Sequence, residues 1–248
     1  MSEPELSEHA RRNQAHWDAD AADYQHRNAG HIDRGEAWGV WQIPEAEVQA
    51  LGDVSGLDVL ENGCGAAQWG RALAARGARM TGLDLSEAQL AFAREAGTDF
   101  PLVQGSAESL PFEDASFDLV FADHGAFTFA DPYRTIPEAA RVLRPGGRLV
   151  FSHSSPLDAI CWDERSQSML PALQRSYFDL HREDWTEFVT FNLPYSRWIQ
   201  LFGANGLQVE DLIELRPAAD ATSTYRDDSD RAWARRWPMD QIWKLRKR

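Results

Sequence analysis

The sequence predicts an α/β fold in which a mostly parallel sheet carries helices on both faces. Two observations predict this fold. Short apolar runs alternate with single helix-length segments through the middle of the chain, which is typical of parallel strands joined by crossover helices. The run Val59-Leu60 leads into a glycine turn, and the next run, Arg79 to Asp84, ends in an acid. A strand, a glycine turn, a helix and a second strand that ends in an acid form half of a nucleotide-binding unit.

The segments before the first strand are predicted to be helical. Residues 7 to 27 form a polar pattern that includes the stretch Trp17-Asp18-Ala19-Asp20-Ala21-Ala22-Asp23-Tyr24. Residues 37 to 51 are expected to form a second helix, with Pro44 in its first turn and Leu51 facing inward. Residues 1 to 52 are therefore predicted to be a helical cap on a single domain that spans residues 1 to 248.

Residues 53 to 155 are predicted to be the core of this domain. The first strand covers residues 57 to 60, and the helix after the glycine turn ends at Arg76, where Gly77 is a natural C-terminal cap. Ser86-Glu87-Ala88-Gln89 has the pattern of a capping box and starts the next helix. An apolar stripe at helical spacing precedes the fifth strand and comprises Ile136, Ala139, Ala140 and Leu143.

The alternation of strands and helices stops after the fifth strand. Residues 156 to 203 form an aromatic-rich insertion, and residues 204 to 248 contain the final strands, predicted at 207 to 215 and 241 to 246. The polar stretch 217 to 236 is longer than ordinary connections, so it is expected to be either a pocket rim or an oligomer contact.

The residues of the glycine turn indicate which adenosine-containing ligand fits. A dinucleotide fingerprint requires glycine or alanine at its sixth position, where this chain has Gln68. Glu61, two residues before Gly63, would repel a pyrophosphate at the helix N-terminus and would suit a cationic amino group. The turn therefore favours a cationic ligand without phosphate.

Four motifs in order resemble those of the class I S-adenosylmethionine-dependent methyltransferases. Glu61-Asn62-Gly63-Cys64-Gly65 matches their first motif, an acid followed by G-x-G. The segment 104 to 112 is similar to their third-strand motif, with Ser106 where aspartate is usual, and the segment 116 to 123 is similar to their fourth strand. Leu143-Arg144-Pro145-Gly146-Gly147 matches the turn before their fifth strand. The resemblance implies a Rossmann-like, seven-stranded sheet whose seventh strand runs antiparallel between the fifth and sixth.

The resemblance also implies the cofactor, S-adenosyl-L-methionine, and the residues that hold it. Asp84 is expected to bind the ribose, Leu85 to lie beside the adenine, and Asp123 to lie near the centre of the cofactor. Tyr24 either folds over the methionine end or packs on the surface of the core. The remaining cofactor residues are expected in the glycine turn (Glu61, Gly63, Gly65 and Ala67) and at the adenine edge (Ser106, Ala107 and Glu108).

The acceptor is expected under a lid formed by the aromatic insertion. A lid requires apolar area to exclude water, so Trp162, Tyr177, Phe178 and Tyr195 are predicted acceptor contacts; the alternative is that the aromatic residues of the insertion form only a satellite core. If the nucleophile carries a proton, the candidate bases are His124 and His153, which follow the fourth and fifth strands. The alternative for each histidine is a hydrogen bond to a loop carbonyl. No metal site is predicted.

The charge and composition of the chain indicate which classes of binding partner are disfavoured. The net charge of −14 disfavours nucleic acid and anionic membranes, and the segment Ala122-Asp123-His124-Gly125 differs from the signature of enzymes that methylate nucleic-acid bases. Two cysteines give no disulfide framework, and residues 1 to 5 lack the features of a secretory signal, so we expect a cytoplasmic protein.

These features predict an enzyme that methylates a small, largely apolar molecule, of the kind met in secondary metabolism. Three alternatives stay open: a binding protein that keeps the cofactor pocket, a cyclase-like protein on the same fold, and an NAD-dependent oxidoreductase. The sequence does not predict the oligomeric state.

Overall fold

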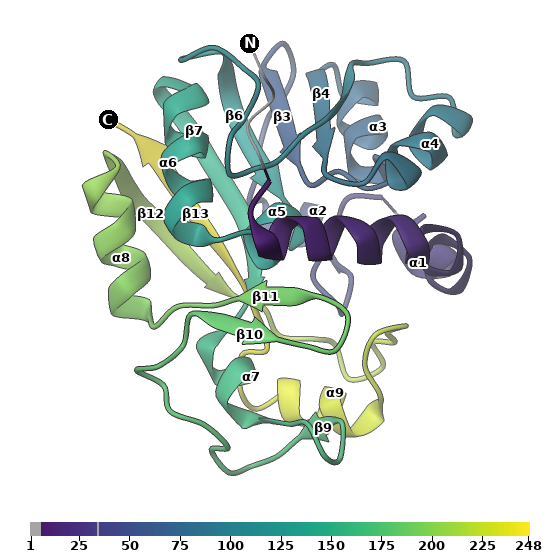
Figure 1. Cartoon of the computed structure of the whole chain (residues 1–248), viewed down its shortest axis with the longest axis vertical. Coiled ribbons are helices and arrows are strands. Elements are labelled where there is room, and N and C mark those ends of the chain that lie inside the picture. Colours follow the sequence, from purple (N-terminus) through teal and green to yellow (C-terminus); the bar gives the residue numbers. More distant parts are fainter. Residues whose placement is uncertain (1–5, 34) are drawn as a thin grey trace.

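A seven-stranded sheet in the order β12-β13-β7-β6-β3-β4-β5 forms the centre of the computed structural model (Figure 1). Every strand except β13 runs in one direction, and β13 lies antiparallel between β7 and β12. The predicted sheet and the place of its seventh strand are confirmed. The strands are β3 (Asp58–Asn62), β4 (Arg79–Asp84), β5 (Leu102–Gln104), β6 (Phe117–Ala122), β7 (Leu143–Ser154), β12 (Leu207–Glu214) and β13 (Asp240–Lys247).

The structure describes residues 6–33 and 35–248, so the prediction about a signal at residues 1 to 5 lies outside the described residues. No helix in those two ranges is both long enough and apolar enough to span a bilayer.

Alternating side chains give the sheet two buried faces. Leu60 and Phe151 belong to a core covered by α6 (Pro132–Val142) and α8 (Tyr195–Ala204). Their neighbours in sequence, Val59 and Val150, belong to a second core covered by α3 (Gln68–Ala75) and the segment around α2 (Glu45–Val48). α4 (Glu87–Glu95) packs on β4 and β5, and Ser86 caps it as predicted by accepting a hydrogen bond from the Gln89 N–H. Helices therefore cover both faces.

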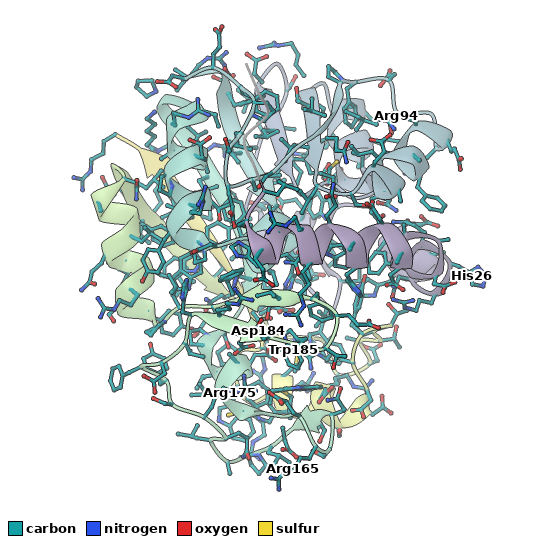
Figure 2. All side chains as sticks on the ribbon, viewed as in Figure 1. His26, Arg94, Arg165, Arg175, Asp184 and Trp185 are labelled. Atoms are coloured by element: carbon teal, nitrogen blue, oxygen red, sulfur yellow. The ribbon has the colours of Figure 1, made fainter. Side chains whose placement is uncertain are left out.

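Helix α1 (Glu8–Ile32) crosses the carboxyl ends of the parallel strands (Figure 1). The buried amide of Asn13 fixes it there by donating to the carbonyls of Phe129 and Val189 and accepting from the Val189 N–H. Arg12 adds contacts to Asp184 and Trp185, which Figure 2 labels beside α1. The predicted helix is confirmed and extends to Ile32.

The prediction of a helix over residues 37 to 51 is wrong. A short hairpin, β1 (Ala37–Trp38) and β2 (Ile43–Pro44), comes first, and only residues 45 to 48 are helical. The left-handed backbone of Gly39 (φ +67°) and Gln42 (φ +54°) turns the hairpin, and Gln49 (φ +51°) ends the helix. The buried carboxylate of Glu45 then accepts the N–H groups of residues 50 to 52, which no longer have helical partners.

A second layer lies beyond the carboxyl ends of the strands, below α1 in Figure 1. It has its own apolar cluster, built around Trp41, Ile160, Met169 and Trp233. The layer is where the chain departs from the alternating pattern, and its hairpins were not predicted. Its elements are α7 (Pro156–Cys161), β8 (Trp162–Asp163), β9 (Ser168–Met169), β10 (Arg182–Asp184), β11 (Val189–Phe191) and α9 (Asp228–Ala234).

Candidate active site

A cavity of about 620 Å³ lies between the carboxyl ends of the strands, α1 and the second layer. This volume is within the range of about 300–1,000 Å³ that is usual for small-molecule sites. Its wall includes the glycine turn, Asp84, Asp123 and His124 on the sheet side, and Trp17 and Tyr24 on α1. The cavity therefore brings the predicted cofactor turn and one of the two candidate bases into one space.

The glycine turn after β3 has no room for a side chain at Gly63. Gly63 has a φ of +84°, and a Cβ placed on it would lie 2.4 Å from the backbone nitrogen of Ala126. Gly65 is also left-handed, with a φ of +52°, and lies on the cavity wall. The N–H groups of Gly63 and Cys64 donate to the Leu83 carbonyl, so β4 fixes the turn. The turn thus presents bare backbone to the cavity, as a ligand in close contact requires.

Asp84 stands at the end of β4 with part of its carboxylate free. One oxygen accepts the Gly65 N–H at 2.7 Å and the other accepts the Ser86 N–H at 2.9 Å. Burial raises the pKa of Asp84 against the lowering effect of these backbone hydrogen bonds. A carboxylate accepts about four hydrogen bonds, so two positions are left for a diol such as a ribose.

Glu61 is the most strongly perturbed acid of the cofactor turn. It is buried in the cavity wall, and burial raises its pKa to about 8. Its Oε2 lies beside Gly70 of α3, whose backbone N–H opposes the rise in pKa, but it makes no geometrically complete hydrogen bond among the described residues. A buried carboxyl group with an unused oxygen gains most from a cationic partner, which would restore its ionised form. The amino group of S-adenosylmethionine fits this requirement.

Gln68, the residue that departs from the dinucleotide pattern, anchors α1. Its amide donates to Gln25 at 2.9 Å, and the Gln25 amide donates to Gln89 at 2.8 Å. These three side chains join α1 to the N-terminal ends of α3 and α4, and all three lie on the cavity wall. Because α1 is held beside the N-terminus of α3, a pyrophosphate at that position would meet the glutamine chain rather than open backbone N–H groups.

His124 follows β6 on an unusual backbone, with φ +55° and ψ −82°. A non-glycine residue in this region is strained, and such strain concentrates at functional sites. The Nε2 atom of His124 lies 3.3 Å from Asp240 Oδ1, and its backbone N–H donates to Ser152 Oγ at 2.7 Å. Burial lowers the pKa of His124, but the charges of Asp240 and Asp123 outweigh it and raise this pKa to about 9.

Asp123, the residue before His124, is held by two hydrogen bonds. Its Oδ1 accepts hydrogen bonds from Ser152 Oγ at 2.5 Å and from the Gly39 N–H at 2.8 Å. Burial raises its pKa, and the charge of His124 opposes this effect. Asp123 therefore lies on the cavity wall with one oxygen fixed by the hairpin and the other unassigned.

Aromatic side chains form the wall opposite the sheet. Trp17 packs edge-on against both Tyr24 and Phe129, with ring centroids 5.3 and 5.0 Å apart. Phe188, in the β10–β11 connection, packs on Phe129, and Tyr225 packs on Tyr24. This wall is thus aromatic, and α1 supplies two of the five rings, Trp17 and Tyr24.

Several predicted site residues lie elsewhere. Both ring nitrogens of His153 face carbonyls, at 2.7 Å (Ser154) and 2.9 Å (Phe191), and burial lowers its pKa to about 4. The carboxylate of Glu108 contacts His9 of α1 and pairs with Arg134 of α6 at 3.3 Å. Ala67 is buried beneath the turn as the residue before α3. These three residues are absent from the cavity wall, which includes the other predicted cofactor residues Leu85, Ser106 and Ala107.

The four predicted acceptor contacts also lie outside the cavity wall. Trp162 lies under the Arg226 guanidinium, 4.6 Å from its ring centroid, and Phe178 is 84% exposed. The Tyr177 hydroxyl accepts the Tyr195 N–H at 2.9 Å, and the Tyr195 hydroxyl donates to Gln241 at 2.7 Å. Trp162 and Tyr177 belong to the apolar cluster of the second layer, the alternative left open above.

Sequence reasoning missed most of the wall formed by α1 and its surroundings. The unpredicted wall residues include Trp17, Asp20, Gln25, Asn28, His31, Gly39, Val40, Phe129, Phe188 and Tyr225. A sequence signal existed for Trp17 and Asp20, which belong to the same W-D-x-x-A-x-x-Y stretch as Tyr24. The other positions depend on how α1 and the loops pack against the sheet.

Comparison with known proteins agrees with this geometry. The sequence model of the family described as "Methyltransferase domain" matches residues 60–151, which span the glycine turn through β7. A solved S-adenosylmethionine-dependent methyltransferase from Mesorhizobium loti is 27% identical and superposes with a TM-score of 0.67, over 82% of this chain and 96% of that chain. Residues 60–151 thus match a methyltransferase domain, and the chain is similar in sequence and fold to class I S-adenosylmethionine-dependent methyltransferases, whose cofactor is S-adenosyl-L-methionine.

Curated relatives match over shorter stretches. Demethylmenaquinone methyltransferase from Lactococcus lactis is 35% identical over 116 residues, which are 44% of this chain and 46% of that protein. The chain spans about half the length of the first curated relatives that it matches. The solved [4+2]-cyclase SpnF superposes with a TM-score of 0.63 over 99% of both chains at 18% identity, which shows a shared fold alone.

Proposed function

We propose that this protein transfers the methyl group of S-adenosylmethionine to a small, uncharged and largely apolar molecule. The observation that carries the proposal is the cavity itself, in which the bare glycine turn, Asp84 and Glu61 face the same space as His124 and the aromatic wall. The cofactor supplies an activated methyl group, and the chain supplies orientation and a water-poor site. Asp84 holds the ribose, Glu61 faces the amino group, and Leu85 and Ala107 flank the adenine.

The charges on the wall support an uncharged acceptor. Acidic side chains line it at Asp20, Asp84, Asp123 and Glu187, and Glu61 adds a further negative charge where a cation restores its ionised form. The guanidinium of Arg27 is on the wall too, but it is paired with Asp20 at 2.5 Å. A phosphorylated or carboxylated acceptor would therefore enter a field of its own sign.

His124 is the proposed base, because it is the candidate histidine that faces the cavity. His153 and the four insertion aromatics are not part of this proposal, since they lie away from the wall. His124 is needed only if the nucleophile carries a proton.

Calorimetric titration with S-adenosylhomocysteine, with NADH in parallel, tests the cofactor assignment. We expect binding of the first and none of the second; the reverse result would contradict the proposal. A screen of uncharged aromatic hydroxyl compounds against their carboxylated counterparts, read by mass spectrometry of the product, then tests the acceptor class. Cofactor binding with no methylated product from any acceptor would favour the binding or cyclase-like alternative.

A further inference from the structure

One backbone turn holds two carboxylates whose charges act on His124, and one of them, Asp240, contacts its imidazole. The consecutive N–H groups of Gly39 and Val40 donate to Asp123 Oδ1 at 2.8 Å and to Asp240 Oδ2 at 2.9 Å. Asp240 is only 2% exposed and comes from β13, far from His124 in sequence. The hairpin thus fixes the two acids relative to each other.

His124 and Asp240 are within ion-pair distance. His124 Nε2 and Asp240 Oδ1 are 3.3 Å apart, and neither atom makes a geometrically complete hydrogen bond in the described part of the chain. The other ring nitrogen, Nδ1, lies 3.4 Å from Thr128 Oγ1, and Thr128 is a residue of the cavity wall. One edge of the ring is therefore bound to a buried acid, and the other edge points to the wall.

We propose that Asp240 is the positioning residue for His124: it holds the proton on Nε2 and so leaves Nδ1 as the proton-accepting atom. This inference rests on the proposed function and adds to it the nature of the acceptor, which presents a hydroxyl group beside Thr128. In the transfer, the acceptor oxygen forms a bond to the methyl carbon while the carbon–sulfur bond breaks with its electron pair remaining on sulfur. The hydroxyl proton passes to Nδ1, and the ring then carries a proton on both nitrogens.

The electrostatics around the ring agree with this arrangement. The charged and titratable groups that act on His124 are Asp123, just after β6, Asp240 of β13, Asp158 of α7 and His153 of β7. Three of these four groups are acids, which is why the pKa of His124 is raised to about 9. The ring becomes a proton acceptor as the pH approaches this pKa. A cation bound in the cavity would lower the pKa of His124 toward 7.

The test is a long-range proton–nitrogen NMR titration of ¹⁵N-histidine protein, with His124 assigned from the spectrum of His124→Gln. In the wild type we expect the neutral ring to carry its proton on Nε2 and the titration midpoint to lie near 9. In Asp240→Asn we expect the midpoint to fall by at least one pH unit. The control is Asp230→Asn, which removes a buried carboxylate of α9 that makes no contact with His124; its midpoint should stay unchanged.

Two outcomes overturn the proposal: a neutral tautomer protonated on Nδ1, or an unchanged midpoint in Asp240→Asn. The tautomer is read from the wild type, so the proposal stays falsifiable if Asp240→Asn does not fold. Calorimetry with S-adenosylhomocysteine separates this test from that of the proposed function. An Asp240→Asn protein that binds the ligand normally but shows no shift refutes the positioning role alone, whereas a wild type that binds no ligand refutes the proposed function.

Discussion

The hydroxyl groups of Tyr24 and Tyr225 lie 2.7 Å apart and join α1 to the segment before α9. Both side chains line the cavity, so this hydrogen bond bridges two otherwise separate parts of its wall. A ligand that leaves between these two parts has to break the bridge. A neutral hydrogen bond contributes about 0.5–1.5 kcal/mol, which corresponds to roughly a two- to twelvefold change in a rate.

Tyr225→Phe removes this bridge while keeping the ring. We therefore expect the dissociation rate of S-adenosylhomocysteine, measured by stopped flow, to rise severalfold. Tyr133→Phe is the matched control, because Tyr133 is a surface tyrosine outside the cavity wall. An unchanged rate in Tyr225→Phe would mean that the ligand leaves by another path.

Asp84→Ala should weaken the binding of S-adenosylhomocysteine. Two charge-assisted hydrogen bonds to the ribose are lost, each worth roughly 1.5–3 kcal/mol before compensation, so calorimetry should show a loss of at least tenfold in affinity. Asp99→Ala, at an exposed position, is expected to bind like the wild type. Equal affinities for the two variants would refute the ribose assignment.

His153 makes stability depend on pH. Its pKa is about 4 in the folded chain against 6.5 for the free side chain, because burial disfavours the charged ring. Between pH 4 and pH 6.5 the unfolded chain binds more protons than the folded chain. The contribution of neutral His153 to the free energy of unfolding is therefore complete above pH 6.5 and is lost as the pH falls toward 4. The slope is about 1.4 kcal/mol per pH unit. Urea unfolding should show a lower free energy of unfolding at pH 5 than at pH 7. We expect a smaller difference between the two pH values in His153→Asn than in His26→Asn, a control at an exposed position.

Gly39→Ala should destabilise the protein through Asp240. An added Cβ would lie 2.6 Å from Asp240 Oδ2, and the φ of +67° is unfavourable for alanine. Gly97→Ala is the control: its φ is +77°, but nothing lies within 4 Å of its added Cβ. We expect Gly39→Ala to lower the free energy of unfolding by about 1–3 kcal/mol more than the control does. Equal melting temperatures of Gly39→Ala and Gly97→Ala would show that the Asp240 side chain can move away from the added Cβ without loss of stability.

The sheet was predictable because its signals are local. The apolar runs of β3, β4 and β6, the capping box at Ser86 and the glycine turn each depend on a few adjacent residues. The helix expected over residues 37 to 51 failed because apolar periodicity does not reveal a left-handed residue such as Gln42. A left-handed backbone is strained for any residue that has a Cβ. It persists here because tertiary contacts hold the hairpin, among them the hydrogen bond from the Gly39 N–H to Asp123.

The acceptor side of the site was less predictable for a related reason. Aromatic composition singled out Trp162 and Phe178, but it does not tell which aromatic residues face a cavity. Phe188 reaches the wall because β10 and β11 pair beside α1, and this pairing depends on the buried Asn13. Asp240 could not have been associated with His124, because only the insertion of β13 between β7 and β12 brings them together.

The place of β13 also has a consequence for how the protein is made. Synthesis runs from the N-terminus, so β7 and β12 leave the ribosome before the strand that joins them and until then lack their shared neighbour. Unpaired strand edges invite pairing with other chains. In a nascent chain that ends before Asp240, His124 has no carboxylate from β13 beside it. On our proposal, Asp240 fixes the proton of His124 on Nε2 only when the sheet is complete. Incomplete chains would therefore have the cofactor turn but no histidine with Nδ1 fixed as the proton-accepting atom.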